Sequence, residues 1–358
     1  MIALNLPARF EDASASPFVT RLSRDGVDGA CLAAEFGVSQ TYQLPGQAFE
    51  IDVPEGDDLV GDVVFADPPN GRVSRWIRAT SPHNTLLVTE RCDQLCIMCS
   101  QPPKKSHTDQ FVHFEAACRL APRGMTIGIS GGEPLLFKDQ VFGLIESVHS
   151  VRPDISFHVL TNAQHFAETD LDRLRQPALQ NVLWGVPLYA ADASLHDEIV
   201  GKTGAQGQLF NGLALMARAG LAIELRTVLL NKNYSALPAL AHLVSARLPF
   251  IHVWAIMQLE RAGFARNRWL DQFVDHSADP GALIEAVSVA SATGIDVSLY
   301  NVPYCTVPVG LRRFLRQSIS DWKRTYAAEC LECSVKTICS GFFEWHAELS
   351  DYATGAPV

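Results

Sequence analysis

The chain has 358 residues, of which 47% are hydrophobic and 19% are charged. This is the profile of a soluble globular protein that is long enough for two or three domains. The formal net charge of −10 argues against non-specific binding to nucleic acid. No run of 18 apolar residues occurs, and the first residues lack a basic stretch followed by a long apolar one. We therefore expect no membrane span, no signal peptide and a cytoplasmic location.

Seven of the nine cysteines fall into two groups. In a reducing compartment, such groups indicate metal sites rather than disulfides. Cys31 and Cys118 stand alone, and a lone cysteine is usually a buried small hydrophobe. The two groups are Cys92, Cys96 and Cys99, and then Cys305, Cys330, Cys333 and Cys339.

Residues 1–80 have the pattern of a small β-rich domain. Short apolar alternations are separated by turn-forming residues, and residues 63–65 and 73–77 flank a Pro-Pro-Asn-Gly turn. This arrangement predicts a β-hairpin. Nothing in this stretch indicates catalysis. We expect it to be either a structural cap or a docking surface that offers a strand edge to a peptide.

From residue 81 to about residue 300, apolar strand-like segments alternate with helix-like segments. Such alternation predicts a parallel sheet, and six βα units predict a partial (β/α)6 TIM barrel with the overall class α/β. Ligands of such sheets bind at the carboxyl ends of the strands. The expected strands are 85–90, 125–130, 155–161, 182–188, 221–230, 250–256 and 295–300, and the expected helices are 108–120, 138–150, 169–176, 192–200, 208–219, 235–246 and 280–292.

The cysteines of the first group directly follow the first of these strands, with the spacing Cx3Cx2C. Three thiolates this close together can hold three irons of a [4Fe–4S] cluster, which is ordinarily held by four cysteines. The remaining iron is then open to a small molecule that carries an amine and a carboxylate. The alternative is a zinc site with a fourth ligand elsewhere, although structural zinc sites usually pair their ligands as CxxC.

Polar residues follow or interrupt several of the other strands. Ser130 ends the second strand, and Gly131, Gly132 and Glu133 follow it, where the glycines allow close approach of a ligand and Glu133 offers an acceptor for an ammonium group. A turn with only a structural role is the alternative for these residues. Thr161 and Asn162 end the third strand. Glu224 and Arg226 share one face of the fifth strand, where they form either a ligand clamp or a structural ion pair.

Strand–helix alternation stops at residue 301, and the last four cysteines of the chain follow. Cys305, Cys330, Cys333 and Cys339 suffice to hold a second [4Fe–4S] cluster, with a four-cysteine zinc site as the alternative. We therefore expect residues 301–358 to form an auxiliary cluster domain.

Residues 81–300 resemble the radical S-adenosylmethionine (SAM) superfamily, on the strength of the Cx3Cx2C loop and of Gly131, Gly132 and Glu133. This resemblance implies that the first cluster binds SAM and cleaves it reductively to a 5′-deoxyadenosyl radical, which abstracts hydrogen from a substrate. It implies that SAM is held by Ser130, Gly131, Gly132, Glu133, Thr161 and Asn162, with Met98 against the adenine. Beside these residues, Arg226, oriented by Glu224, is our candidate for holding the SAM carboxylate. Met257 is a candidate for lining the adenine pocket, with core filling as the alternative.

The sequence departs from the superfamily at two positions. Met98 stands where an aromatic residue is common, and residues 186–189 lack the serine that often contacts SAM after the fourth strand.

Both ends of the chain also resemble maturases of the His-Xaa-Ser system, the HxsC family. The similarity lies in residues 84–92 and 96–103, and in residues 317–323, 329–336 and 339–343. It implies modification of a ribosomally made peptide with His-Xaa-Ser repeats, and an electron donor such as flavodoxin or ferredoxin. The C-terminal segment also resembles the auxiliary-cluster domains called SPASM or twitch. A radical SAM enzyme acting on a small molecule and a non-catalytic iron–sulfur or zinc protein are the alternatives.

Overall fold

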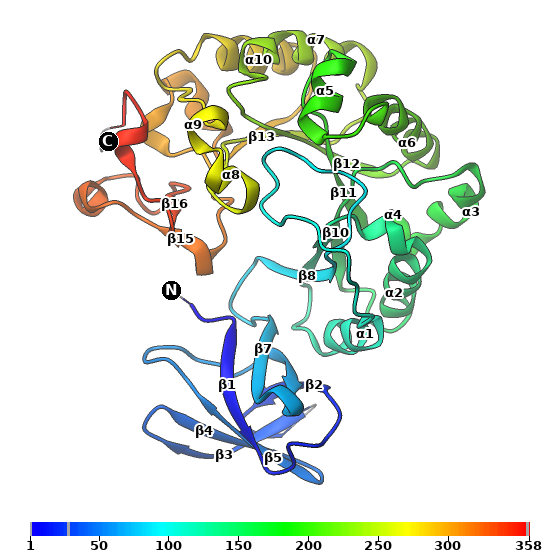
Figure 1. Ribbon diagram of the computed structural model, residues 1–358, viewed down its shortest axis with the longest axis vertical. Coiled ribbons are helices and arrows are strands. Elements are labelled where there is room, and N and C mark those ends of the chain that lie inside the picture. Colours follow the sequence, from blue (N-terminus) through cyan, green and yellow to red (C-terminus); the bar gives the residue numbers. More distant parts are fainter. Residues whose placement is uncertain (1, 27–28, 356–357) are drawn as a thin grey trace. The chain divides into compact units, whose positions relative to one another are not determined.

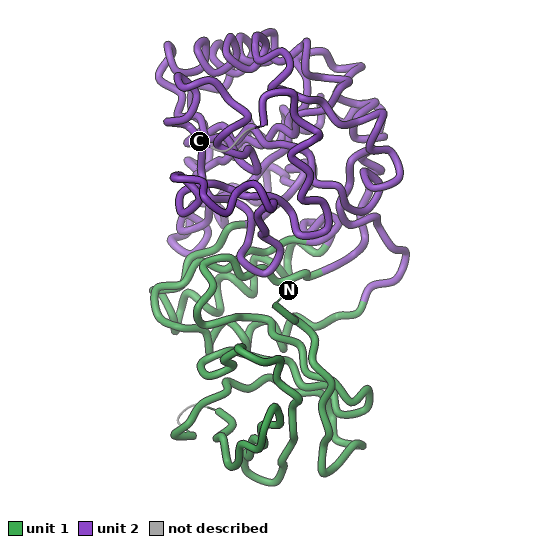
Figure 2. The backbone as a smooth tube through the Cα atoms, turned by 90° about the vertical axis from the view of Figure 1, so that its left-hand side faces the viewer, with its two compact units in different colours: residues 1–88, 108–130, 137–158 green, residues 89–107, 131–136, 159–358 purple. Residues whose placement is uncertain are grey.

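A computed structural model describes residues 2–26, 29–355 and 358. The chain divides into two compact units, which Figure 2 distinguishes by colour. The first comprises residues 1–88, 108–130 and 137–158, and the second comprises residues 89–107, 131–136 and 159–358. None of the described helices is long and apolar enough to cross a membrane. The domain boundaries that we predict near residues 80 and 300 stay predictions.

The N-terminal strands of the first unit close into a β-barrel with the order β1-β5-β4-β3-β2-β6-β7. The predicted hairpin is confirmed, since β6 and β7 pair in antiparallel fashion across the turn. Closure gives each strand two neighbours, so this barrel lacks the free strand edge that we considered for peptide docking. The strands are β1 (Asn5–Phe10), β2 (Phe18–Ser23), β3 (Gly29–Phe36), β4 (Ser39–Leu44), β5 (Gln47–Asp52), β6 (Val63–Asp67) and β7 (Arg72–Ile77).

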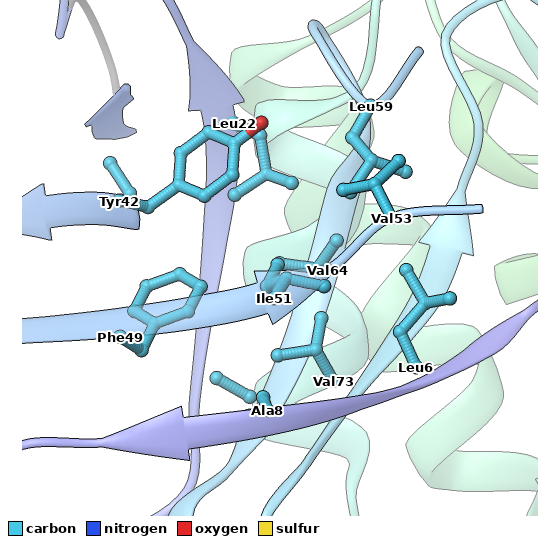
Figure 3. Close-up of a cluster of buried hydrophobic side chains, with 12 residues drawn as sticks. Leu6, Ala8, Leu22, Tyr42, Phe49, Ile51, Val53, Leu59, Val64 and Val73 are labelled. Carbon is cyan, nitrogen blue, oxygen red and sulfur yellow. The ribbon is translucent and has the colours of Figure 1, made fainter. Parts of the chain in front are cut away.

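Alternate side chains of these strands point inward and form the core of the barrel. Tyr42, Phe49 and Ile51 are almost fully buried, and the rings of Tyr42 and Phe49 stack with centroids 5.8 Å apart (Figure 3). Burying a side chain of this size contributes about 1.5–3 kcal/mol. The buried Arg75 guanidinium donates to Asp62 at 2.7 Å, so this charge is paired. The barrel therefore has a core of its own.

Seven further strands form a second sheet in the order β14-β13-β12-β11-β10-β9-β8. The registers between β11 and β12, β12 and β13, and β13 and β14 are all parallel. The predicted α/β class is confirmed, and a parallel sheet of this kind fits a partial TIM barrel. The strands are β8 (Asn84–Thr89), β9 (Thr126–Gly131), β10 (Ser156–Leu160), β11 (Val182–Pro187), β12 (Ala222–Val228), β13 (Val253–Met257) and β14 (Val297–Tyr300).

Helices alternate with these strands along the chain, and Figure 1 shows α7 and α10 side by side. The helix expected from residue 108 begins only at Phe111, whose backbone amide donates to the Asp109 side chain at 3.1 Å. The helices are α1 (Phe111–Leu120), α2 (Lys138–Val151), α3 (Leu171–Leu174), α4 (Pro177–Gln180), α5 (Ala193–Val200), α6 (Ala205–Ala219), α7 (Leu237–Arg247), α8 (Gly263–Asn267), α9 (Trp269–Gln272) and α10 (Gly281–Ala292).

The described residues after β14 form short 3₁₀ turns and one small antiparallel sheet of two strands, β15 (Arg324–Thr325) with β16 (Phe342–Phe343). Their apolar cluster is built from few residues. Cys330, Phe342 and Leu349 are buried in it, with Cys305 and Cys333 packed against them. Cysteine side chains thus supply much of the interior of this segment.

Candidate functional site

The cysteine loop, residues 90–107, follows β8 and is anchored to two helices of the second unit. The backbone amides of Leu95 and Ile97 donate to the carbonyls of Val200 and Ile199, at 3.0 and 2.9 Å. On the other side, the amide of Phe264 in α8 donates to the carbonyl of Cys99 at 2.8 Å. The loop is therefore held by backbone hydrogen bonds at the positions between and beside its cysteines.

Two glycines with positive φ make these contacts sterically possible. A Cβ on Gly201 (φ +65°) would lie 2.8 Å from the carbonyl oxygen of Leu95. A Cβ on Gly263 (φ +53°) would lie 2.3 Å from the carbonyl oxygen of Cys99. Both distances are shorter than van der Waals contact, so a side chain at either position would push the cysteine loop away.

The three thiols of this loop lie close enough to influence one another. Burial, followed by the nearby Glu133, Asp93 and Cys99, raises the pKa of Cys92 to about 11. Burial and then the other two thiols raise the pKa of Cys96 to about 12. Metals bind thiolates, so loading this site would release protons.

No group of three His, Cys, Asp or Glu side chains within residues 2–26, 29–355 and 358 has the arrangement that would hold a metal ion. The thiolates of a [4Fe–4S] cluster each bind a different iron.

The Gly-Gly-Glu turn, residues 131–133, lies directly against the start of the cysteine loop. The amide of Gly132 donates to the carbonyl of Thr89 at 2.9 Å, and the amide of Glu133 donates to the carbonyl of Arg91 at 2.8 Å. A Cβ on Gly132 would lie only 2.1 Å from the Arg91 oxygen. The glycine thus permits a close approach to the chain itself, whereas the predicted approach to a ligand stays a prediction.

Glu133 is 1% exposed, and hydrogen bonds surround its carboxylate. Oε1 accepts from the Thr161 hydroxyl at 2.6 Å and from the Leu135 amide at 2.8 Å, and Oε2 accepts from the Asn162 amide at 2.6 Å. Burial raises the pKa of Glu133, and these donors oppose that effect. The structure therefore brings together Glu133, Thr161 and Asn162, which we predict as SAM-binding residues.

Asp93, which lies between the first two cysteines of the loop, is a further residue of this site that we did not predict from the sequence. Oδ2 pairs with Lys202 Nζ at 2.5 Å and with His165 Nε2 at 3.3 Å, and Oδ1 accepts from the Asn162 side-chain amide at 2.9 Å. Burial raises the pKa of Asp93, but the bonds from His165 and Lys202 outweigh burial and leave it below its usual range. No sequence pattern links Asp93 with Lys202.

Strands β12, β13 and β14 carry a second polar group of side chains. Glu224 and Arg226 form an ion pair, and Tyr300 Oη donates to Glu224 Oε2 at 3.2 Å. Arg226 Nη2 lies 3.6 Å from Met257 Sδ. Glu224, Arg226 and Met257 are thus neighbours, as a ligand clamp and a structural pair both require. Their contact with SAM stays a prediction.

Met98 is buried in an apolar cluster of the second unit rather than exposed at the loop surface. Its companions include Ile199, Leu259 and Trp269. Tyr189, at the end of the strand that lacks the expected serine, packs against the same cluster. Packing of Met98 against adenine stays a prediction.

Ser130, the next-to-last residue of β9, is half-buried.

The four C-terminal cysteines also lie near one another. Burial, then Cys339, raises the pKa of Cys305 to about 11, with smaller effects from Cys330 and Cys333. The backbone amides of Tyr304 and Gly341 donate to Cys339 Sγ at 3.3 and 3.4 Å. Such N–H donors would stabilise a thiolate at this position.

No protein-family model and no curated protein matches this chain. Among solved structures, it is similar to Streptococcus suis SuiB bound to S-adenosylmethionine, with 14% identity, a TM-score of 0.49, and 60% of this chain and 49% of SuiB covered. The match thus spans about half the length of SuiB. A radical SAM methyltransferase from Sphaerobacter thermophilus is 15% identical, with a TM-score of 0.44 and coverage of 75% and 76%.

A third similar structure is anSMEcpe with bound AdoMet and the Cp18Cys peptide, at 12% identity and a TM-score of 0.38, covering 49% of this chain and 50% of that one. The structural neighbours thus include a radical SAM methyltransferase and proteins bound to SAM.

Proposed function

We propose that this protein is a radical SAM enzyme. One observation carries the proposal. Within one compact unit, the Cx3Cx2C loop and the Gly-Gly-Glu turn are joined backbone to backbone, through Gly132 to Thr89 and Glu133 to Arg91. A loop that leaves one iron of a cluster open therefore lies beside the buried carboxylate of Glu133. A ligand with an amine and a carboxylate needs the open iron for chelation and the Glu133 carboxylate as an acceptor for its amine.

The residues of the site divide into separate roles in this proposal. Cys92, Cys96 and Cys99 bind three irons as thiolates. Ser130, Gly131, Gly132 and Glu133 hold the amino group of SAM, and Arg226, oriented by Glu224, holds its carboxylate. Met98 and Met257 line the adenine, and Thr161 and Asn162 complete the polar contacts. When bound, the cluster would supply the electron that cleaves SAM to methionine and a 5′-deoxyadenosyl radical.

The finer part of the proposal concerns the substrate and the C-terminal segment. We propose a ribosomally made peptide with His-Xaa-Ser repeats as substrate, and flavodoxin or ferredoxin as electron donor. We assign Cys305, Cys330, Cys333 and Cys339 to a second [4Fe–4S] cluster. The proximity of these four thiols and the two backbone donors on Cys339 support that assignment.

The test begins with protein purified under strictly anaerobic conditions. Iron and sulfide analysis is expected to give about eight irons per chain. After reduction, SAM is expected to yield 5′-deoxyadenosine, which chromatography detects. Replacing Cys92, Cys96 and Cys99 together by Ala should abolish this product and about half of the iron, whereas the control Cys118→Ala should change neither. Iron-loaded wild-type protein that leaves SAM intact would refute the proposal.

A second experiment separates the peptide from a small molecule as substrate. A synthetic peptide with His-Xaa-Ser repeats is incubated with the active enzyme and followed by mass spectrometry. A change in peptide mass that requires SAM supports the peptide assignment. Release of 5′-deoxyadenosine with an unmodified peptide would refute the His-Xaa-Ser assignment and leave the superfamily proposal standing.

A further inference from the structure

Asp93 joins three segments of the second unit that are far apart in the sequence. It belongs to the cysteine loop, Asn162 and His165 follow β10, and Lys202 lies between α5 and α6. One oxygen accepts from Asn162 and the other faces Lys202 and His165. Each segment is thus tied to the cysteine loop through a single carboxylate.

The tie is stronger than an ordinary surface ion pair. The side chains of Asp93 and Lys202 are 24% and 23% exposed, so water screens their attraction only in part. Lys202 Nζ also donates to Gln164 Oε1 at 2.7 Å, which fixes its position. A pair in the same loop, Lys104 with Glu90, is 60% and 41% exposed and so contributes little.

Asn162 extends the connection to Glu133. Its side-chain amide donates to Asp93, while its backbone amide donates to Glu133 Oε2 at 2.6 Å. One residue therefore bridges the carboxylate of the cysteine loop and the carboxylate of the Gly-Gly-Glu turn. A displacement of either loop would break a bond to Asn162.

We propose that Asp93 is a positioning residue, which, together with Asn162 and Lys202, fixes the cysteine loop relative to Glu133. Its effect on the loop is independent of any bound group. Its effect on cluster retention and on SAM rests on the function proposed above.

The decisive experiment is hydrogen–deuterium exchange on metal-free protein, read over residues 92–101. Asp93→Asn removes the charge while keeping the size of the side chain, and Lys202→Met removes the partner. Because charge-assisted bonds of this kind are lost, each variant should speed exchange of these amides about tenfold or more. The exchange rate in the double variant should be close to that in either single variant, because both substitutions remove the same interaction between Asp93 and Lys202.

Two variants serve as controls. Lys202→Arg keeps the positive charge and should restore most of the protection. Lys104→Met, in the same loop, should leave the exchange rate unchanged within about twofold, because its pair is exposed. Unchanged exchange in Asp93→Asn would overturn the proposal. So would faster exchange throughout the second unit, since that is a general loss of stability rather than positioning.

Iron-loaded protein tests the second part. In Asp93→Asn, the half of the iron that is assigned to the cysteine loop should be released to a chelator about tenfold faster than in the wild type. SAM should also perturb the electron paramagnetic resonance spectrum of the variant only at a higher concentration than it does in the wild type. Equal release rates in variant and wild type would overturn this part. If the wild type bound no iron at all, the proposed function would fail, while the exchange result would still decide the positioning role.

Discussion

The backbone amide of Tyr189 donates to Nδ1 of His196 at 3.3 Å, and the two rings stack with centroids 5.8 Å apart. His196 therefore accepts a hydrogen bond through its unprotonated nitrogen while it is 1% exposed. Burial lowers the pKa of His196 to about 4, and the nearby Asp197 only partly opposes this effect. The pKa of His276, which is fully buried, is also lowered to about 4.

We expect stability to fall as the solution is acidified below about pH 6.5. The unfolded chain binds protons at the ordinary histidine pKa, whereas the folded chain keeps both rings neutral down to about pH 4. The contribution of these two rings to stability thus rises with pH in this window and is constant above it. At pH 5.5, each of the two rings should lower the free energy of unfolding by on the order of 1 kcal/mol relative to neutral pH. Urea unfolding at several pH values measures this. A slope that stays the same in His196→Asn would contradict the assignment to His196.

Glu133→Gln should weaken SAM binding about tenfold or more, while cluster content is unchanged. The amide that replaces one oxygen also faces an N–H donor, so the free energy of unfolding should drop by about 1–3 kcal/mol. Calorimetric titration with SAM and urea unfolding measure the two effects. Thr161→Val is the milder comparison, because it removes only one donor from Glu133. Unaltered SAM affinity in Glu133→Gln would return the turn to a purely structural role.

Gly263→Ala should displace the cysteine loop, because the added methyl group would lie 2.3 Å from the Cys99 carbonyl oxygen at a positive φ. We expect a loss of more than about 1 kcal/mol of stability and a loss of iron. The matched control is Gly207→Ala in α6, where nothing lies within 4 Å of the new Cβ. That variant should gain about 0.5–1 kcal/mol. Equal iron content in the two variants would argue against the clash.

Cys333→Ala should leave about four irons per chain and loosen residues 301–355. The apolar cluster of this segment is small and contains cysteines itself, so metal loss removes much of its interior. We expect this variant to cleave SAM without forming a peptide product. Chromatography measures the 5′-deoxyadenosine, and mass spectrometry detects the peptide product. Wild-type peptide modification in this variant would exclude a role of the second cluster in the reaction. Zinc in place of the remaining iron would refute the iron–sulfur assignment.

The sequence was sufficient to predict strands β8 to β14, because apolar runs alternating with helical patterns have a local signature. It also placed Glu224 beside Arg226, since residues two apart share a face of a strand. It could not pair Asp93 with Lys202, which are 109 residues apart and belong to separate loops. Closure of the barrel could not be predicted for the same reason, since it depends on residues far apart in the sequence. Asn5 of β1, for example, pairs with Ser74 of β7.

That pairing of β1 with β7 has a consequence for synthesis. β1 is synthesised before the other strands of this barrel, yet its second neighbour, β7, is complete only after residue 77. Until then its apolar face and one row of its backbone groups stay available to other chains. Slow translation or a stalled ribosome before β7 has emerged should therefore favour aggregation or chaperone binding of the nascent chain, and emergence of β7 should relieve it.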